Sequence, residues 1–451
     1  MSRRALVAGL VVAVTAAVVV AAVLTGGGTV TRPAGRAPAV RTPAPAPSAA
    51  QALRAIDAAD VRPHLTALAR AARGGNRAAG TPGDAATRAL LVARLRAAGW
   101  RVRAETVEFP SFDPGGPPRV TPSGGRRLGG DDVRTIAYSP GGRVTAAGVR
   151  AVGLAPGRAG DAGCRGDDFA ALRRGEVALV QRGTCRLAVK ARNAQAAGAA
   201  AVLIANDGRP GRTGVIPGTL GEPGVRIPAL FVSTAAAADL QRAGRVTLAV
   251  DAEAGRRRTA NILAEAGSGP RVVMAGAHLD SVAEGPGLND DGSGVAALLA
   301  LAEAVHGAAP EGSRLRLGFW GAEELGLHGS RGYVRGLDRG ERAAIAAYVN
   351  LDMVGTRGGR VAVYAGDERV RRSLRRNLRA RGRERLTTER LGGSSDHAPF
   401  ARAGIPVGGI FTGLDRCYHR ACDDLDNVDP GRTADAAAAT AATLLELARD
   451  R

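Results

Sequence analysis

The stretch Gly276–Gly294, read as GAHLDSVAEGPGLNDDGSG, constrains the fold of this chain more than any other. The short apolar run Arg271–Ala277 before it predicts a buried strand. The alanine- and leucine-rich segment Val295–Val305 after it predicts a helix, with Asp291 or Ser293 as the N-cap. The chain is therefore expected to pass from a buried strand through a glycine-rich turn into a helix.

Three side chains of this turn have the chemistry of a metal site. They are His278, Asp280 and Asp290. A neutral imidazole and carboxylates gathered at the end of a strand suit a divalent metal, zinc above all. A His-x-Asp pair and a loop rich in Gly, Asn and Asp also occur by chance. This stretch alone therefore leaves a metal site and an ordinary loop open.

Length and composition narrow the class of protein. A chain of 451 residues has room for two to three domains, and 45% hydrophobic residues suffice for real cores. The net charge is 62 − 42 = +20, which by itself favours a nucleic-acid partner. Lys190 is the only lysine and 3% of residues are aromatic, so the charge is spread as arginine and few rings can stack on bases. We therefore expect no nucleic-acid partner.

The N-terminal segment predicts export. Arg3 and Arg4 precede the apolar run Ala5–Leu24, so residues 1–24 are a signal peptide or an uncleaved membrane anchor. No cysteine lies near it, which excludes lipid attachment of the lipoprotein kind. Residues 25–49 are rich in Pro, Ala and Gly and predict a linker. The rest of the chain is expected outside the cytoplasm, secreted or attached to the membrane through 5–24.

Cysteine usage agrees with export. The four cysteines are Cys164, Cys185, Cys417 and Cys422. They allow three pairings, and we favour the two local pairs because these fall in separate regions of the chain. Reduced thiols and a cysteine zinc site are the alternatives, but neither pair has the Cys-x-x-Cys spacing of a zinc ribbon. In an exported protein we expect disulfides.

The pattern of elements predicts an inserted domain. Residues 50–125 begin with helices and a strand, and the same texture resumes at 253–451. Between them, residues 126–252 hold many short β-like runs separated by Gly and Pro. In the outer parts strands alternate with helices, which predicts an α/β fold with a mostly parallel sheet and helices on both faces.

Further carboxylates follow predicted strands. Glu323 and Glu324 come after the run Leu315–Trp320, and Asp352 ends the run Ala347–Leu351. The ends of parallel strands lie along one rim, which is where such folds place their sites. An acidic pair that starts a helix is the alternative for the two glutamates. A lone buried carboxylate at Asp352 would be costly without a partner.

Two histidines compete for a place in the site. The segment Arg416–Asp423, RCYHRACD, sets His419 beside Tyr418 between two cysteines, where a disulfide would hold both side chains in place. A surface loop with a structural bridge is the alternative. His397 follows Asp396 in another polar segment, and this pair could be metal ligands or a hydrogen-bonded support of the pocket wall. The residues alone leave the choice open.

Two stretches resemble known families. Gly163–Asp207 resembles the protease-associated (PA) domain in its cysteines, its lysine-containing helix and the apolar strand that ends in Asn. The motifs HLDS, NDDGSG, WGAEELGLHGS, NLDMVG, SDHAPF and CYHRACD resemble those of secreted co-catalytic dizinc aminopeptidases related to aminopeptidase Y and the bacterial leucyl aminopeptidases. This resemblance covers Ala50–Phe109 weakly and Thr259–Asp429 strongly.

The second resemblance implies two zinc ions and their ligands. Residue by residue, it implies that His278 and Asp352 bind one zinc. It implies that Glu324 and His419 bind the other, and that Asp290 bridges both. It thereby favours His419 over the other candidate histidine.

The resemblance also implies catalytic roles. Glu323 matches the general base, Asp280 the partner whose carboxylate fixes the tautomer of His278, and Tyr418 the group that stabilises the oxyanion. Two zinc ions would lower the pKa of a water between them towards about 7, and Glu323 would take its proton. One departure is Ser394, where bacterial relatives often carry Arg, so contacts at the substrate end are expected to differ.

These features favour an exported zinc aminopeptidase that is a monomer and acts on peptides with a free N-terminus. A carboxypeptidase or dipeptidase of the same superfamily would keep the metal site, and the many arginines could form its cationic pocket. A PA-domain binding protein with an inactive peptidase domain would lack a ligand or the base, yet all are present. A single-zinc aminoacyl cyclase of related fold is disfavoured because five ligands for two metals are present.

Overall fold

A computed structural model describes residues 45–390 and 392–450 of the chain. The predicted signal peptide or anchor at 1–24 lies outside the described residues, as does most of the predicted linker at 25–49. Within the described part of the chain, no helix is both long enough and apolar enough to cross a membrane.

The larger sheet has eight strands in the order β1-β10-β12-β11-β13-β16-β14-β15. These strands are β1 (Arg101–Asp113), β10 (Glu253–Gly267), β11 (Arg271–His278), β12 (Ser313–Trp320), β13 (Ile345–Leu351), β14 (Val361–Tyr364), β15 (Leu386–Glu389) and β16 (Val407–Phe411). The central strands β12, β11, β13 and β16 are parallel, whereas β10 and β14 pair antiparallel with β12 and β16. The predicted α/β fold is confirmed, with the parallel arrangement at the centre of the sheet.

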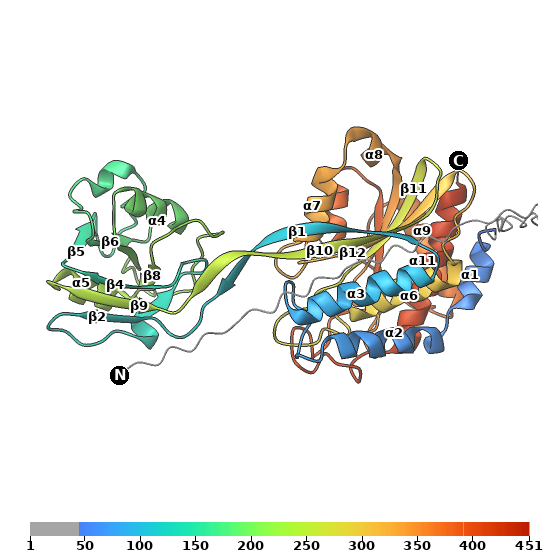
Figure 1. Ribbon diagram of the computed structural model, residues 1–451, viewed down its shortest axis with the longest axis horizontal. Helices are drawn as coiled ribbons and strands as arrows, with labels where there is room; N and C mark the ends of the chain where they lie inside the picture. Colours follow the sequence, from blue (N-terminus) through green and yellow to red (C-terminus); the bar gives the residue numbers. More distant parts are fainter. Residues whose placement is uncertain (1–44, 391, 451) are drawn as a thin grey trace, which may run out of the picture. The chain divides into compact units, whose positions relative to one another are not determined.

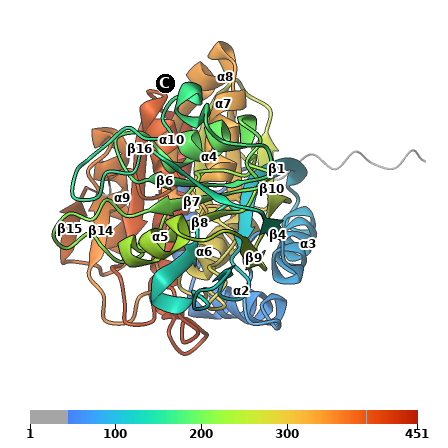
Figure 2. The same cartoon turned by 90° about the vertical axis from the view of Figure 1, so that its left-hand side faces the viewer.

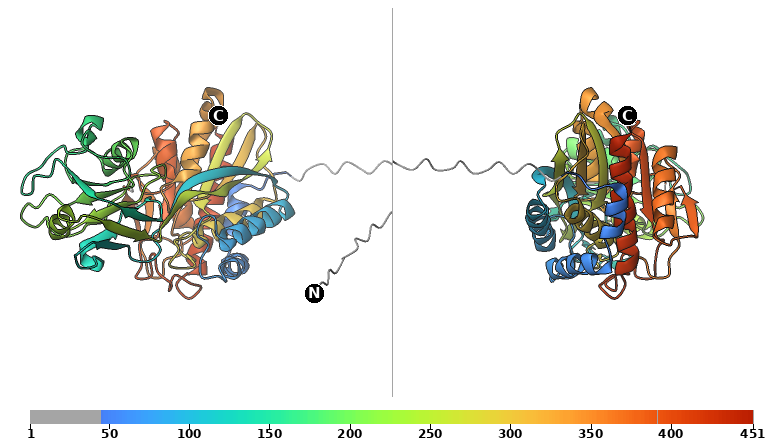
Figure 3. Two further views of the ribbon diagram at one scale, coloured as in Figure 1. Left: turned by 60° about the vertical axis from the view of Figure 1, so that its left-hand side comes forward. Right: turned by 90° about the vertical axis from the view of Figure 1, so that its right-hand side faces the viewer.

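Helices cover both faces of this sheet (Figure 1). One face carries α1 (Ala49–Ala55), α2 (Ala58–Ala71), α3 (Pro82–Ala97), α6 (Gly292–Val305), α9 (Glu368–Ala380) and α11 (Pro430–Arg449), and the other carries α7 (His328–Gly336), α8 (Arg339–Ala344) and α10 (His397–Arg402). Figure 3 shows α11 beside α1. Side chains alternate along β11, so Val273 and Ala275 join the first layer while Val272 and Met274 join the second. Burial on both faces explains why the central strands are mostly apolar.

The helix α6 begins directly after the glycine-rich turn. Asp291 is its N-cap, because Oδ1 of this residue accepts a hydrogen bond from the backbone nitrogen of Gly294 at 2.9 Å. The same carboxylate accepts hydrogen bonds from the backbone nitrogens of His278 at 3.1 Å and Met353 at 3.2 Å. One side chain therefore joins the end of β11, the start of α6 and the segment after β13.

The residues between β1 and β10 form two smaller sheets. A five-stranded sheet has the order β3-β8-β7-β6-β5, and a three-stranded sheet has the order β2-β9-β4. Their elements are β2 (Arg119–Pro122), η1 (Gly130–Asp132), β3 (Val133–Thr135), β4 (Gly142–Ala146), β5 (Val149–Val152), η2 (Gly166–Phe169), β6 (Val177–Gln181), α4 (Leu187–Ala196), β7 (Ala201–Ala205), β8 (Ala229–Val232), α5 (Thr234–Gln241) and β9 (Val246–Val250). Figure 2 shows α4 and α5 with these strands.

Two adjacent strands connect the smaller sheets to the larger one. Strands β1 and β10 pair antiparallel along β1, from Arg101 opposite Glu265 to Asp113 opposite Glu253. The chain enters the smaller sheets at the end of β1 and returns through β10. An insertion of this kind leaves the strand order of the larger sheet intact, because its entry and exit are neighbours.

Both predicted cysteine pairs are disulfide bonds. Cys164 is joined to Cys185 within the smaller sheets, and Cys417 is joined to Cys422 in the loop after β16. No cysteine is left free. The alternatives of reduced thiols and a cysteine zinc site therefore do not apply.

Candidate metal centre

The candidate site lies at the carboxyl ends of the central parallel strands. His278 is the last residue of β11, and Asp352 directly follows β13. Glu323 and Glu324 come shortly after β12, which ends at Trp320. Parallel strands end on the same edge of a sheet, so these side chains meet there, as the strand pattern predicted.

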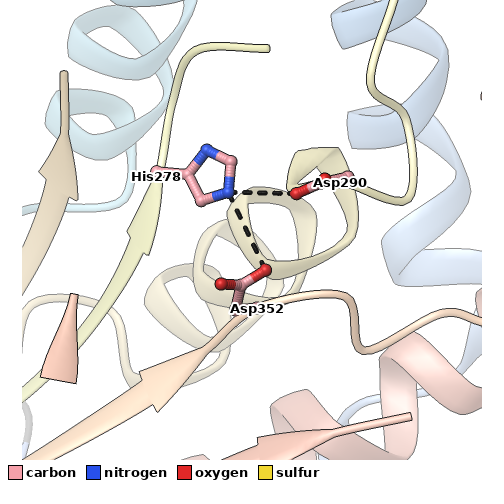
Figure 4. Close-up of side chains that lie close together, drawn as sticks. All are labelled: His278, Asp290 and Asp352. Atoms are coloured by element: carbon pink, nitrogen blue, oxygen red, sulfur yellow. Dashed lines mark hydrogen bonds and ion pairs between the residues drawn. The ribbon is translucent and has the colours of Figure 1, made fainter. Parts of the chain in front are cut away.

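A first triplet of possible ligands comes from three different segments (Figure 4). Nε2 of His278 lies 3.1 Å from Oδ1 of Asp290 and 3.8 Å from Oδ1 of Asp352. One ligand atom from each residue lies within 4.8 Å of the others, and the histidine and Asp290 are buried. Three side chains that converge in this way can surround a single ion.

A second triplet shares Asp290 with the first. Nε2 of His419 lies 3.3 Å from Oδ2 of Asp290 and 3.1 Å from Oε2 of Glu324. These ligand atoms also lie within 4.8 Å of one another. The two oxygens of Asp290 therefore face two different histidines, which is the arrangement of a carboxylate that bridges two ions.

Backbone strain gathers around these two triplets. Of the six described non-glycine residues with positive φ, four lie in segments that carry the site. They are Ala322, Leu327, Met353 and His419, with φ between 53° and 60°. Each such conformation costs on the order of 1–3 kcal/mol, and functional sites are where this cost is commonly retained.

A disulfide-closed loop brings Tyr418 and His419 to the site. The Cys417–Cys422 bond encloses both residues, and their rings stack with centroids 3.8 Å apart. Tyr418 is 37% exposed, and both residues line a cavity of about 690 Å³. Glu323 and Glu324 line the same cavity. The tyrosine hydroxyl is therefore available to a bound molecule.

The position of Asp280 differs in detail from the prediction. The nearest acceptor to Nδ1 of His278 is the backbone carbonyl of Asp280 at 3.2 Å, whereas its carboxylate lies 3.9 Å away. Oδ1 of that carboxylate instead accepts a hydrogen bond from the backbone nitrogen of Glu323 at 3.1 Å. Asp280 therefore orients the imidazole through its main chain and the glutamate loop through its side chain.

Sequence reasoning missed Arg77, which lies in the segment between α2 and α3. Its side chain is fully buried and donates hydrogen bonds to the carbonyls of Leu279, Pro286 at 3.0 Å and Gly287 at 2.6 Å. These carbonyls belong to the glycine-rich turn between β11 and α6. Burial lowers the pKa of Arg77, while Asp280 and other nearby carboxylates oppose this shift. A cation buried on this turn balances part of its negative charge.

The electrostatics of the site favour the binding of additional cations. Burial and the carboxylate of Asp290 raise the pKa of Glu324 to about 8, and one of its oxygens has no hydrogen-bond partner. Burial also raises the pKa of Glu323 well above its usual value, although His278 opposes this. Burial would lower the pKa of His278, but the surrounding carboxylates raise it well above its usual value. Imidazole and carboxylate donors held this closely fit zinc, which would relieve their repulsion.

The structure shows where the other candidate residues, His397, Asp396 and Ser394, lie. His397 is buried and packs edge-on against Tyr364, with ring centroids 4.8 Å apart. Neither His397 nor Asp396 belongs to a triplet of possible ligands, whereas His419 does. Ser394 lines the cavity beside the site.

Sequence comparison assigns the family. Residues 261–444 match the profile of peptidase family M28, and residues 144–240 match that of the PA domain. The chain is 36% identical over 403 residues to an aminopeptidase of Pseudomonas aeruginosa, covering 79% of this chain and 74% of the relative. It is 34% identical over 440 residues to a probable lipoprotein aminopeptidase, LpqL, of Mycobacterium tuberculosis, covering 87% and 85%. The chain therefore belongs to peptidase family M28.

Solved structures agree with this assignment. An aminopeptidase from Aneurinibacillus sp. strain AM-1 superposes with a TM-score of 0.63 at 27% identity, covering 88% of this chain and 95% of that one. A zinc aminopeptidase from Bacillus subtilis has a TM-score of 0.57 at 26% identity, covering 86% and 94%. The predictions of a metallo-aminopeptidase and of an inserted PA domain are confirmed, and the zinc relatives imply zinc.

Proposed function

We propose that the chain is an exported aminopeptidase whose catalytic domain holds two zinc ions. His278 and Asp352 would hold one ion, Glu324 and His419 the other, and Asp290 both. The observation that carries this proposal is the pair of triplets that share Asp290, with one oxygen towards each histidine. Histidine and carboxylate ligands with a shared carboxylate are a donor set that suits two zinc ions.

We assign Glu323 as the general base. It belongs to neither triplet, yet its Oε2 lies 4.0 Å from Nε2 of His278 and the residue lines the cavity. Bound zinc would supply Lewis-acid polarisation and lower the pKa of a water in the site. Glu323 takes a proton from the attacking water and passes it to the departing amine. The Tyr418 hydroxyl donates a hydrogen bond to the oxygen that gains charge in the transition state.

The proposed substrates are peptides with a free N-terminus, as the names of the relatives suggest. The test compares a free peptide, its N-acetylated form and its C-amidated form on the purified protein, each with and without a chelator. An aminopeptidase hydrolyses the free and amidated peptides and spares the acetylated one, and the chelator abolishes turnover. Cleavage of the acetylated peptide and not of the amidated one would instead identify a carboxypeptidase.

We further propose that the mature chain acts outside the cytoplasm as a monomer. The charged and apolar segment at 1–24 supports export, and one relative is named a probable lipoprotein aminopeptidase. We assign 50–125 and 253–451 to the peptidase domain and 126–252 to the PA insertion. The return boundary coincides with the start of β10 at Glu253, whereas β2 (Arg119–Pro122), before the first boundary, already pairs within a smaller sheet. Cell fractionation and size-exclusion chromatography test these points. A reduced, cytoplasmic product would contradict export.

A further inference from the structure

A chain of buried hydrogen bonds runs from the interior of the sheet to Asp352. Nε1 of Trp320 donates to the hydroxyl of Tyr348 at 2.8 Å, and this hydroxyl donates to Oδ1 of Asn350 at 2.8 Å. Nδ2 of Asn350 donates to Oγ of Ser395 at 2.8 Å. Ser395 in turn donates to Oδ2 of Asp352 at 2.6 Å. The first four residues are at most 3% exposed, so water does not replace these bonds.

The chemistry of the two end groups fixes the direction of this chain. An indole nitrogen can only donate, and an ionised carboxylate can only accept. The hydroxyl of Tyr348 accepts from Trp320 and must therefore donate its proton onward to Asn350. If the amide of Asn350 were flipped, its NH₂ group would face the Tyr348 hydroxyl and leave that hydroxyl's proton without an acceptor. Its oxygen would then face Ser395 and draw the serine proton away from the Asp352 carboxylate. Each buried group left unpaired in this way is costly, so one arrangement is selected.

The surrounding packing preserves this arrangement. A Cβ atom at Gly276 would overlap the hydroxyl of Tyr348 and the indole nitrogen of Trp320. Glycine at this position of β11 therefore leaves the space that the first hydrogen bond occupies. The ring of Phe400 stacks on Tyr348 with centroids 3.9 Å apart. Phe400 lies on α10, which begins two residues after Ser395, so the stack also anchors the serine.

The last hydrogen bond distinguishes the two oxygens of Asp352. Ser395 donates its hydrogen bond to Oδ2. The other oxygen, Oδ1, lies 3.8 Å from Nε2 of His278 (Figure 4). We propose that Tyr348, Asn350 and Ser395 are positioning residues that hold Asp352 with one oxygen turned towards the metal. This inference rests on the proposed role of Asp352 as a zinc ligand. Removing a group that hydrogen-bonds to a metal ligand and orients it commonly lowers metal affinity 10- to 100-fold.

The test measures zinc affinity in a set of matched variants. Ser395→Ala removes the last donor, and Tyr348→Phe removes a hydroxyl two bonds upstream while keeping the ring stack. The double variant combines them. Ser313→Ala is the control, because this buried serine donates to the carbonyl of Pro310 at the opposite end of β12. Competition with a chromophoric chelator gives the two zinc affinities, and thermal unfolding of the metal-free proteins reports the structural cost separately.

We expect Ser395→Ala to lower the affinity for one zinc ion 10- to 100-fold, and Tyr348→Phe to lower the affinity for the same ion by about tenfold. Because both act through one chain, the double variant should bind zinc no more weakly than Ser395→Ala alone. Wild-type affinity in Ser395→Ala, or multiplied effects in the double variant, would overturn the proposal. Asp352→Asn, measured in parallel, separates the two failures. If it keeps both ions the proposed ligand set is wrong, and if it loses one while Ser395→Ala loses nothing, only the positioning role is wrong.

Discussion

The carboxylate of Asp423 accepts a hydrogen bond from the backbone nitrogen of Asp290 at 3.0 Å. Its other oxygen accepts from the backbone nitrogen of Asn289 at 2.9 Å. Asp423 directly follows Cys422, so the disulfide-closed loop that carries His419 is bound to the residue we propose as the bridge. The second triplet therefore depends on contacts between two segments far apart in the chain.

This connection makes a prediction for the Cys417–Cys422 disulfide. It closes a short loop, so its loss should cost about 2 kcal/mol of stability by chain entropy. Replacing both cysteines by serine should lower turnover tenfold or more, because His419 and Tyr418 lose their fixed position. Steady-state kinetics and thermal unfolding measured together test this. Replacing Cys164 and Cys185 by serine is the control, since that bond lies in the inserted sheets and should leave turnover per folded molecule unchanged.

The strand ends were predictable from the sequence, and the contacts behind them were not. Apolar runs bounded by polar turns predicted β11, β12 and β13 and hence the meeting of His278, Glu324 and Asp352. Arg77 shows the limit. It lies about 200 residues from the carbonyls that it binds, and nothing in its local pattern distinguishes it from the many exposed arginines. The hydrogen bonds of Asp423 are likewise fixed only by folding.

Arg77 should be more sensitive to substitution than any surface arginine. Arg77→Met removes three hydrogen bonds to the glycine-rich turn between β11 and α6. It leaves the buried carbonyls of that turn unpaired, each at a cost of about 1–3 kcal/mol. We expect a clear fall in thermal stability and in zinc content. Arg77→Lys keeps the charge but not the planar fork, so it should recover stability only partly. Arg73→Met, at an exposed position nearby, is the control. Equal effects at both positions would contradict the positioning of the turn by Arg77.

Removal of metal should destabilise the whole peptidase part. Without cations, the buried carboxylates of the site repel one another, and part of that repulsion is relieved only by protonation. Chelation should therefore lower the melting temperature measured at neutral pH, and added zinc should restore it by an amount that grows with the logarithm of the zinc concentration. Magnesium at the same concentration should restore little, because it prefers octahedral oxygen sites. An unchanged melting temperature after complete metal removal would show that the site does not hold ions in the folded state.

The adjacent glutamates provide the sharpest test, because identical side chains are assigned different roles. Glu323→Gln keeps the shape and removes the proton acceptor, so both zinc ions should remain bound while turnover falls on the order of 10²-fold or more. Substrate affinity should change little, since the loss lies in the transition state. Glu324→Gln should weaken the binding of one zinc ion and regain part of its activity at high zinc.

Burial and Asp290 raise the pKa of Glu324 to about 8, so folding without metal at pH 7 forces this carboxyl to take up a proton or to repel its neighbours. Glu324→Gln should therefore be more stable than the wild type without metal and less stable with saturating zinc. Metal content, kinetics and unfolding of the two variants decide the matter, and loss of a zinc ion from Glu323→Gln alone would reverse the roles.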